Sequence, residues 1–402
     1  MVKLNVGVLQ LNPRIGSVKA NIEQANTILA SHGYLTPLTN ITNGVKSHVP
    51  RSKLDLLILP ELAFTGYNFK SPLEIKPYLE PTTSGVSTEW AKQTSRALGC
   101  HVLVGYPEKY FKKVQSIHET SFPTNITSKI SNKLSGNELT PTLNDDHDYT
   151  VYNSAVMVSP TGSVLFNYRK SFLYDADETW GCSESPTMKN GPDSPDVFPL
   201  TGIIMIDQKN ETGSTVDQLN NRESLPKIPL KVQVGICMDL NPYKFQSPFS
   251  NFEFAHAAIH NDASLILCPM AWLHSKSPDI PKQSEFDGTP EAYDKQRKEK
   301  LHSIENNFNN DPSSADMSNV NYWIHRMSPL FRDEYLSSRE KTTYKHKKIL
   351  MATCNRSGIE DYTAYAGSSS IYVFNEDKKI GYYGSLGQGE ESLMVCEVEV
   401  DE

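Results

Sequence analysis

Residues Gln233-Val-Gly-Ile-Cys-Met-Asp-Leu-Asn-Pro-Tyr243 decide the fold and the chemistry that we expect of this chain. The β-branched run Val232–Ile236 is typical of a buried strand, and it stops at Cys237. Pro242 and the amphipathic stretch Phe252–Ile259 indicate a tight turn that leads into a helix. A strand-turn-helix connection holds a side chain out at the end of a sheet, with backbone N–H groups behind it. Cys237 is therefore placed as a nucleophile would be, and a buried cysteine that acts only as a small hydrophobe is the alternative.

Composition and charge restrict the class of protein. The 402 residues carry 39 basic and 47 acidic side chains, a formal charge of −8, without long blocks of one sign. This argues against nucleic acid or an anionic membrane as the main partner. The six cysteines lie far apart, with no CxxC pair and no His/Cys cluster at metal-binding spacing, so we expect no metal and no cofactor.

The chain shows no targeting or membrane signal. Its first residues enter a strand pattern at Lys3–Leu9, without the basic and apolar regions of a signal peptide. No apolar run approaches the roughly 18 residues that a membrane span needs. We therefore expect a cytoplasmic protein, in a reducing setting where a reactive thiol survives.

Strand and helix patterns alternate along the chain, which is typical of an α/β protein. Strand patterns lie at Leu4–Leu11, Leu54–Pro60, Gly99–Tyr106, Gly202–Ile206, Lys231–Val234, Ala263–Pro269, Lys348–Thr353 and Gly367–Phe374. Helical patterns lie at Ser17–Leu29, where Ser17 could be the cap, and at Ser87–Leu98 and Pro290–Phe308. A hairpin is predicted from Tyr152–Val158, a turn at Ser159–Gly162, and Val164–Tyr168.

Polar segments interrupt this pattern at about 111–150, 187–228 and 275–345. Their Ser, Asn, Thr and charged residues predict surface insertions. The sequence assigns no role to the third segment.

Two further reactive residues follow predicted strands. Glu61 comes directly after Leu54–Pro60, and Lys170 ends the predicted hairpin. A glutamate at a strand end is usually solvated, and a lysine there is usually a surface cation. Burial of Glu61 among apolar neighbours would instead raise its pKa, as a general base requires.

Glu61, Lys170 and Cys237, in this order, resemble the triad of the nitrilase superfamily of carbon–nitrogen hydrolases. The resemblance is carried by Leu59-Pro-Glu-Leu62 with Thr65-Gly-Tyr67, by Tyr168-Arg-Lys170 with Phe172-Leu-Tyr-Asp175, and by Gly235-Ile-Cys-Met-Asp-Leu240. It implies one domain over residues 1–402, folded as a four-layer α-β-β-α sandwich with polar surface insertions. Within the superfamily, the chain is most similar to the fungal amidases that act on N-terminal Asn and Gln, through Phe166–Asp175, Gly235–Phe245, Leu265–Leu273 and Asp316–Ile324.

The resemblance implies a reaction and roles for residues. Cys237 would attack the side-chain amide of an N-terminal Asn or Gln to form a thioester, with Glu61 as general acid and base. Lys170 and the N–H of Met238 would stabilise the oxyanion. Ammonia and an N-terminal Asp or Glu would be released, feeding the N-degron pathway. A further glutamate would orient the lysine: Glu184 fits, and Glu178 competes with it.

Substrate recognition asks for more residues. A substrate α-ammonium in a partly dry pocket needs a carboxylate, and the unranked candidates are Asp175, Asp177, Glu178 and Asp239, of which Asp239 could be structural. The aromatic side chains of Tyr67, Trp180 and Trp272 could wall the pocket, although each could equally belong to the core.

The expected partners are peptides and proteins that begin with Asn or Gln, and the choice between monomer and homodimer stays open. Two alternatives also remain. One is an amidase for a small free metabolite, similar to an ω-amidase, and the other is a catalytically silent interaction module.

Overall fold

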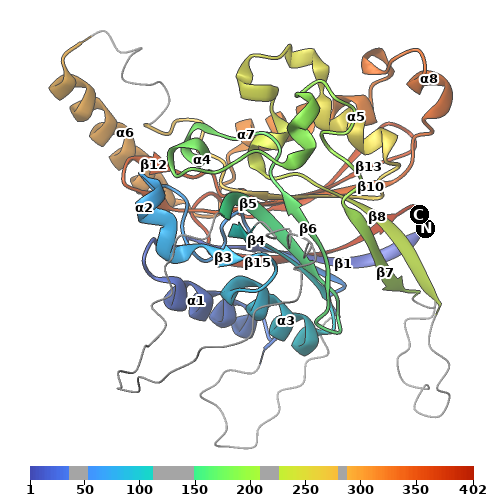
Figure 1. Cartoon of the computed structure of the whole chain (residues 1–402), viewed down its shortest axis with the longest axis horizontal. Helices are drawn as coiled ribbons and strands as arrows, with labels where there is room; N and C mark the ends of the chain where they lie inside the picture. The colour runs from blue at the N-terminus through green and yellow to red at the C-terminus, as the bar shows by residue number, and fades with distance from the viewer. Residues whose placement is uncertain (36–52, 112–148, 209–225, 279–287) are drawn as a thin grey trace, which may run out of the picture.

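The computed structural model describes residues 1–35, 53–111, 149–208, 226–278 and 288–402. Within them, two sheets lie face to face at the centre of the molecule (Figure 1). The first sheet has the order β15-β1-β2-β4-β5-β6, with β3 paired to β4. Its strands are β1 (Val2–Gln10), β2 (Leu56–Ile58), β3 (Glu80–Pro81), β4 (His101–Phe111), β5 (Tyr149–Val158), β6 (Val164–Arg169) and β15 (Ser392–Val400).

The second sheet has the order β14-β13-β10-β9-β8-β7. Its strands are β7 (Gly202–Asp207), β8 (Lys227–Val234), β9 (Leu265–Met270), β10 (Ile349–Asn355), β13 (Ser370–Phe374) and β14 (Ile380–Ser385). A separate two-strand sheet is formed by β11 (Ile359–Glu360) and β12 (Thr363–Ala364).

Helices cover the outer face of each sheet (Figure 1). The first sheet is covered by α1 (Val18–Ser31) and α3 (Val86–Leu98), and the second by α5 (Glu253–His260) and α7 (Met317–Arg326). Side chains alternate across the sheets: Leu56 and Ile58 join the core between the sheets, whereas Leu57 packs in the layer beneath α1 and α3. The expected four-layer α-β-β-α sandwich is confirmed.

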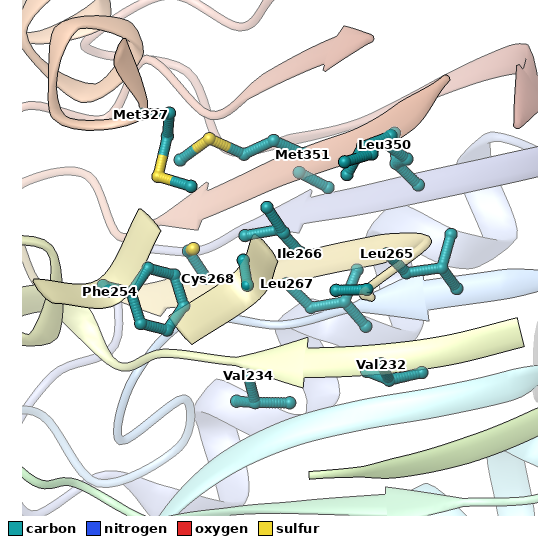
Figure 2. Close-up of a cluster of buried hydrophobic side chains, with 14 of the residues drawn as sticks. Val232, Val234, Phe254, Leu265, Ile266, Leu267, Cys268, Met327, Leu350 and Met351 are labelled. Atoms are coloured by element: carbon teal, nitrogen blue, oxygen red, sulfur yellow. The ribbon is translucent and has the colours of Figure 1, made fainter. Parts of the chain in front are cut away.

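The core around the second sheet joins strands to the helical layer. Figure 2 shows Val232 and Val234 of β8 beside β9, with Phe254 of α5 and Met327, which follows α7, packed in the same cluster. This packing fixes the end of β8, where Cys237 follows.

Most predicted elements are present, with differences at their boundaries. Ser17 is the N-cap residue of α1, but its side chain makes no capping hydrogen bond, so that part of the expectation is wrong. The predicted hairpin is β5 and β6. The C-terminal strands β14 and β15 were not predicted, although β15 pairs with β1 along its whole length.

Two of the predicted insertions are shorter than expected. The second segment contains β7 at the strand predicted for Gly202–Ile206, and β7 pairs with β8 in the second sheet. In the third segment, Val320 and Trp323 of α7 are fully buried in the core. Their spacing along the helix gives α7 one apolar face inside a polar-looking segment. The remaining parts, at 112–148, 209–225 and 279–287, lie outside the described residues.

A membrane crossing requires a helix that is both long and apolar. The described residues contain none.

Candidate active site

Cys237 stands on a strained turn at the end of β8. Its φ is 46°, in the left-handed region that residues other than glycine rarely adopt. The chain turns there into the short 3₁₀ helix η3 (Cys237–Leu240), and α5 begins only at Glu253. Such strain persists where the surrounding structure holds it, and it is concentrated at functional sites. The sequence therefore predicted both the turn and the helix, because the helix expected at Phe252–Ile259 is α5, displaced by one residue.

Asp239 fixes this turn to the segment that carries Lys170. Its fully buried carboxylate accepts a hydrogen bond from the N–H of Ile236 at 2.7 Å. It also accepts bonds from the N–H groups of Ser171 and Phe172, which directly follow Lys170, at 3.1 and 2.8 Å. Asp239 is thus a structural anchor, and the alternative that it binds a substrate ammonium loses its support.

Glu61 and Lys170 meet in the interior, and both are fully buried. The Lys170 Nζ donates to Glu61 Oε1 at 2.6 Å and to Asp177 Oδ2 at 2.7 Å. The N–H of Ala271 donates to Glu61 Oε2 at 2.7 Å. One ammonium therefore bridges two carboxylates.

Asp177, and not Glu184, holds the lysine. Asp177 lies in α4 (Asp175–Thr179) and is fully buried. Glu184 is half-buried, and it accepts a hydrogen bond from the hydroxyl of Tyr243 at 2.7 Å. The competing candidate, Glu178, forms an exposed ion pair with Lys244 at 3.0 Å. Both predictions for the residue that orients Lys170 are corrected, because the turn into α4 directs Asp177 inward.

Asn153 is a site residue that the sequence reasoning missed. It lies in β5, and its Nδ2 donates to Glu61 Oε1 at 2.7 Å and to Asp177 Oδ1 at 2.9 Å. Its backbone oxygen accepts from the N–H of Lys170 at 2.8 Å. The available signal was an amide side chain inside a strand with an apolar second half, because a buried amide must find partners.

Cys237 opens into a cavity of about 810 Å³. Met238, Trp272 and Asp175, three of the predicted substrate-binding residues, also line it. The full lining is Leu173, Tyr174, Asp175, Glu178, Cys237, Met238, Asn241, Lys244, Phe245, Gln246, Ala271, Trp272, Leu273, Ser275, Ser318, Asn319 and Tyr322. The charged side chains among these lining residues are two carboxylates, Asp175 and Glu178, and one lysine, Lys244.

Two predicted wall residues lie elsewhere. Trp180 is fully buried in a cluster of core side chains, and no part of it lines the cavity. Tyr67 is buried beside the triad, with the Lys170 Nζ 5.8 Å from the centre of its ring. The prediction for Trp180 is therefore corrected, and Tyr67 contacts the lysine instead of the cavity.

Comparison with known proteins agrees with this geometry. The family described as carbon-nitrogen hydrolase matches residues 5–239, which is more than half of the chain. The chain belongs to the carbon-nitrogen hydrolase family. It is a hydrolase that acts on the carbon–nitrogen bonds of amides.

Individual relatives of this carbon-nitrogen hydrolase match over nearly its whole length. It is 29% identical to a Saccharomyces cerevisiae protein named Protein N-terminal amidase, over 100% of this chain and 96% of the other. Two crystal structures of N-terminal amidase, one with an Asn-Glu peptide and one with a Gln-Val peptide, each have a TM-score of 0.70 and 28% identity. Each match covers 99% of this chain and 98% of the other.

The environment of the hydrolase site sets its protonation states. Burial raises the pKa of Glu61, and the charge of Lys170 opposes this. Burial also raises the pKa of the Cys237 thiol well above its usual value, and the charge of Glu61 adds to the rise. Burial lowers the pKa of Lys170, but the carboxylates of Asp177 and Glu61 outweigh it and hold that pKa well above its usual value. The resting site therefore holds an ammonium, a neutral thiol and a carboxylate that can take the thiol proton.

This arrangement predicts the pH dependence of hydrolysis. Glu61 must be ionised to act as a base, and its pKa is raised from 4.5. We therefore expect kcat/KM to fall, as the pH decreases, through an ionisation above 4.5, while Lys170 keeps its proton on the alkaline side. A pH profile of kcat/KM measures this. If the activity falls on the acidic side with a pKa at or below the ordinary glutamate pKa, the assignment of Glu61 is contradicted. As a control, Glu184→Gln should leave the acidic side of the profile unchanged.

Proposed function

We propose that this hydrolase removes the side-chain amide of an N-terminal Asn or Gln from peptides and proteins. The products are ammonia and an N-terminal Asp or Glu, which is the type of end that an N-degron pathway receives. The observation that carries the proposal is the position of Cys237, which lines a cavity beside a buried carboxylate–ammonium cluster. The relatives named N-terminal amidase, and their structures with Asn and Gln peptides, support the choice of substrate.

The reaction would proceed in two halves. Glu61 takes the proton of Cys237 while the sulfur forms a bond to the amide carbon. The oxyanion is stabilised by Lys170 and the N–H of Met238, and loss of one such donor costs about 3–4 kcal/mol in comparable enzymes. Glu61 then gives its proton to the leaving nitrogen, so that ammonia departs and a thioester remains.

Water completes the cycle. Glu61 deprotonates a water molecule as its oxygen bonds to the thioester carbon, and the carbon–sulfur bond then breaks. The proton returns from Glu61 to the sulfur, which restores the thiol. Throughout the cycle, Asp177 keeps Lys170 charged while Glu61 alternates between its two protonation states.

The charges of the cavity favour a substrate with a free α-ammonium. Asp175 and Glu178 line the cavity together with Lys244, and Lys244 already forms an ion pair with Glu178. A wall with two carboxylates suits a substrate that carries an ammonium and disfavours one that carries a carboxylate. The volume of about 810 Å³ also exceeds what one small amide fills.

We expect the two cavity carboxylates to bind the α-ammonium. The double variant Asp175→Asn/Glu178→Gln should raise KM for an Asn-initiated peptide by roughly 5-fold, because the ammonium loses carboxylates that are exposed to solvent, and such pairs contribute about 0–1 kcal/mol. The value of kcat should change little, since neither residue touches Cys237 or Lys170. Steady-state kinetics with the single and double variants shows how much of the increase in KM is due to each carboxylate.

Glu184→Gln is the matched control for that double variant. Glu184 carries the same charge in the same segment, but it bonds to Tyr243 and does not line the cavity. An unchanged KM in the double variant would show that the α-ammonium binds elsewhere.

A substrate series tests the function itself. The protein is incubated with Asn- and Gln-initiated peptides of increasing length, with N-acetylated copies, and with small free amides. Mass spectrometry then detects the amide-to-acid mass change at the first residue. Conversion of free-amine peptides but not of the acetylated copies supports the proposal. Turnover of the small amides alone would favour the metabolite amidase and overturn it.

A further inference from the structure

The two oxygens of the Glu61 carboxylate have different environments. Oε1 accepts two hydrogen bonds, from Lys170 Nζ at 2.6 Å and from Asn153 Nδ2 at 2.7 Å. Oε2 accepts one, from the N–H of Ala271 at 2.7 Å. A carboxylate oxygen offers about two acceptor positions. Oε1 is therefore saturated by these two donors, whereas Oε2 keeps one position for a proton.

Oε2 is also the oxygen on the side of the nucleophile. Oε2 bonds to the N–H of Ala271, the residue that directly follows β9. Ala271 lines the same cavity as Cys237. Because Oε1 is saturated and Oε2 bonds to a residue of the cavity wall, we expect Oε2 to receive the proton of the sulfur.

We propose that Asn153 is a positioning residue that saturates Oε1 of Glu61 and thereby directs the proton of Cys237 to Oε2. In the first step, the S–H bond breaks, an O–H bond forms at Oε2, and the sulfur bonds to the amide carbon. In the next step, the same oxygen releases that proton to the leaving nitrogen. Lys170 donates no proton in either step. This inference rests on the role of Glu61 in the proposed function.

The second bond of Asn153 keeps its amide in this orientation. Nδ2 also donates to Oδ1 of Asp177 at 2.9 Å, so its two hydrogens face two carboxylates. A flipped amide would turn its oxygen toward both negative charges, which the hydrogen-bond network excludes. Asn153 thus adds donors without adding charge, in a cluster that has two carboxylates for one ammonium.

Two substitutions test this role. Asn153→Leu removes both donors at similar volume, and Asn153→Asp keeps the shape but replaces the donors with a third carboxyl group. Either change removes a bond that favours the ionised form of Glu61, so the acid limb of the kcat/KM profile should move to higher pH, further for Asn153→Asp. We expect kcat to fall by roughly 10- to 100-fold with little change in KM.

Alkylation provides a readout that needs no substrate. The rate at which iodoacetamide modifies Cys237, measured by peptide mass spectrometry over a pH range, follows removal of the thiol proton. Its pH dependence should shift in the same direction as the kinetic limb. If the wild-type protein deamidates no peptide but the alkylation shift is present, the proposed function fails and the inference about Asn153 stands.

Asn21 supplies the matched control. It is a buried asparagine whose Nδ2 donates to two backbone oxygens, of Arg14 at 2.9 Å and of Phe64 at 2.8 Å. Asn21→Leu therefore loses these two bonds and the one that its Oδ1 accepts from the N–H of Arg14 at 3.0 Å. It should lower the melting temperature without moving either pH profile. Folded Asn153 variants whose two profiles match the wild type would overturn the proposal. Should Asn153→Leu fail to fold, the isosteric Asn153→Asp decides by the same criterion.

Discussion

Replacing Cys237 with serine should abolish amide hydrolysis, with a loss of roughly 10⁴-fold or more in kcat/KM. The hydroxyl fits in the same space, so the cavity and its charges should remain intact. The loss is chemical. Burial already raises the pKa of the Cys237 thiol. A serine hydroxyl is far less acidic than a thiol, so the carboxylate of Glu61 cannot deprotonate it as readily. Hydrolysis of an Asn-initiated peptide, followed by mass spectrometry, measures the effect.

Binding separates this chemical defect from misfolding. Isothermal titration of Cys237→Ser with the same peptide should give a Kd close to the wild-type KM. The control is Cys396→Ser, a partly exposed cysteine on β15, which should keep its activity. Substantial turnover by Cys237→Ser would show that the reaction does not require the sulfur as nucleophile.

Replacing Lys170 with methionine should both inactivate and destabilise the protein. The methionine leaves the carboxylates of Glu61 and Asp177 facing each other, fully buried, without the ammonium that bridges them at 2.6 and 2.7 Å. Removal of one partner from a buried ion pair costs about 3–5 kcal/mol, because the remaining charge is uncompensated. Denaturant unfolding at neutral pH measures the loss of unfolding free energy. The deficit should shrink at acidic pH, where a proton neutralises one of the two carboxylates.

The double variant Lys170→Met/Asp177→Asn distinguishes charge from packing. It removes one of the two unpaired charges, so it should recover part of the stability and none of the activity. Lys244→Met is the comparison at an exposed pair with Glu178, where the expected cost is only about 0–1 kcal/mol. Equal losses for Lys170→Met and Lys244→Met would contradict the buried-pair account.

Local sequence patterns predicted the residues at strand ends better than their contacts. Glu61, Lys170 and Cys237 each follow an apolar strand, and parallel and hairpin connections bring such ends together. Asp177 could not be separated from Glu184 in this way, because both belong to one acidic loop. The turn at Tyr174, whose N–H bonds to Asp177, decides which carboxylate faces inward, and Asp177 is the buried residue of α4.

Other misses have related physical causes. Asn153 has its role because of a neighbour 92 positions away, Glu61; the local pattern marks it as a polar residue of a strand but does not identify that partner. The sequence around Trp180 does not distinguish a tryptophan that lines a pocket from one that fills the core. In the structure, Trp180 packs in a cluster of buried hydrophobic side chains. The helix α7 was not predicted because its few apolar residues are separated by polar residues in the sequence and come together on one face only when the helix forms.

The four donors on Asp239 have a consequence for anyone who redesigns this scaffold. The hydroxyl of Tyr168 and the N–H groups of Ser171, Phe172 and Ile236 converge on that carboxylate, so the loop with the sulfur and the loop with the amine are clamped as one unit. Transplanting either loop alone into another protein would leave its half of the clamp empty. A new substrate preference is therefore better introduced in the outer wall of the cavity, around Gln246 and Ser318, than in either clamped loop.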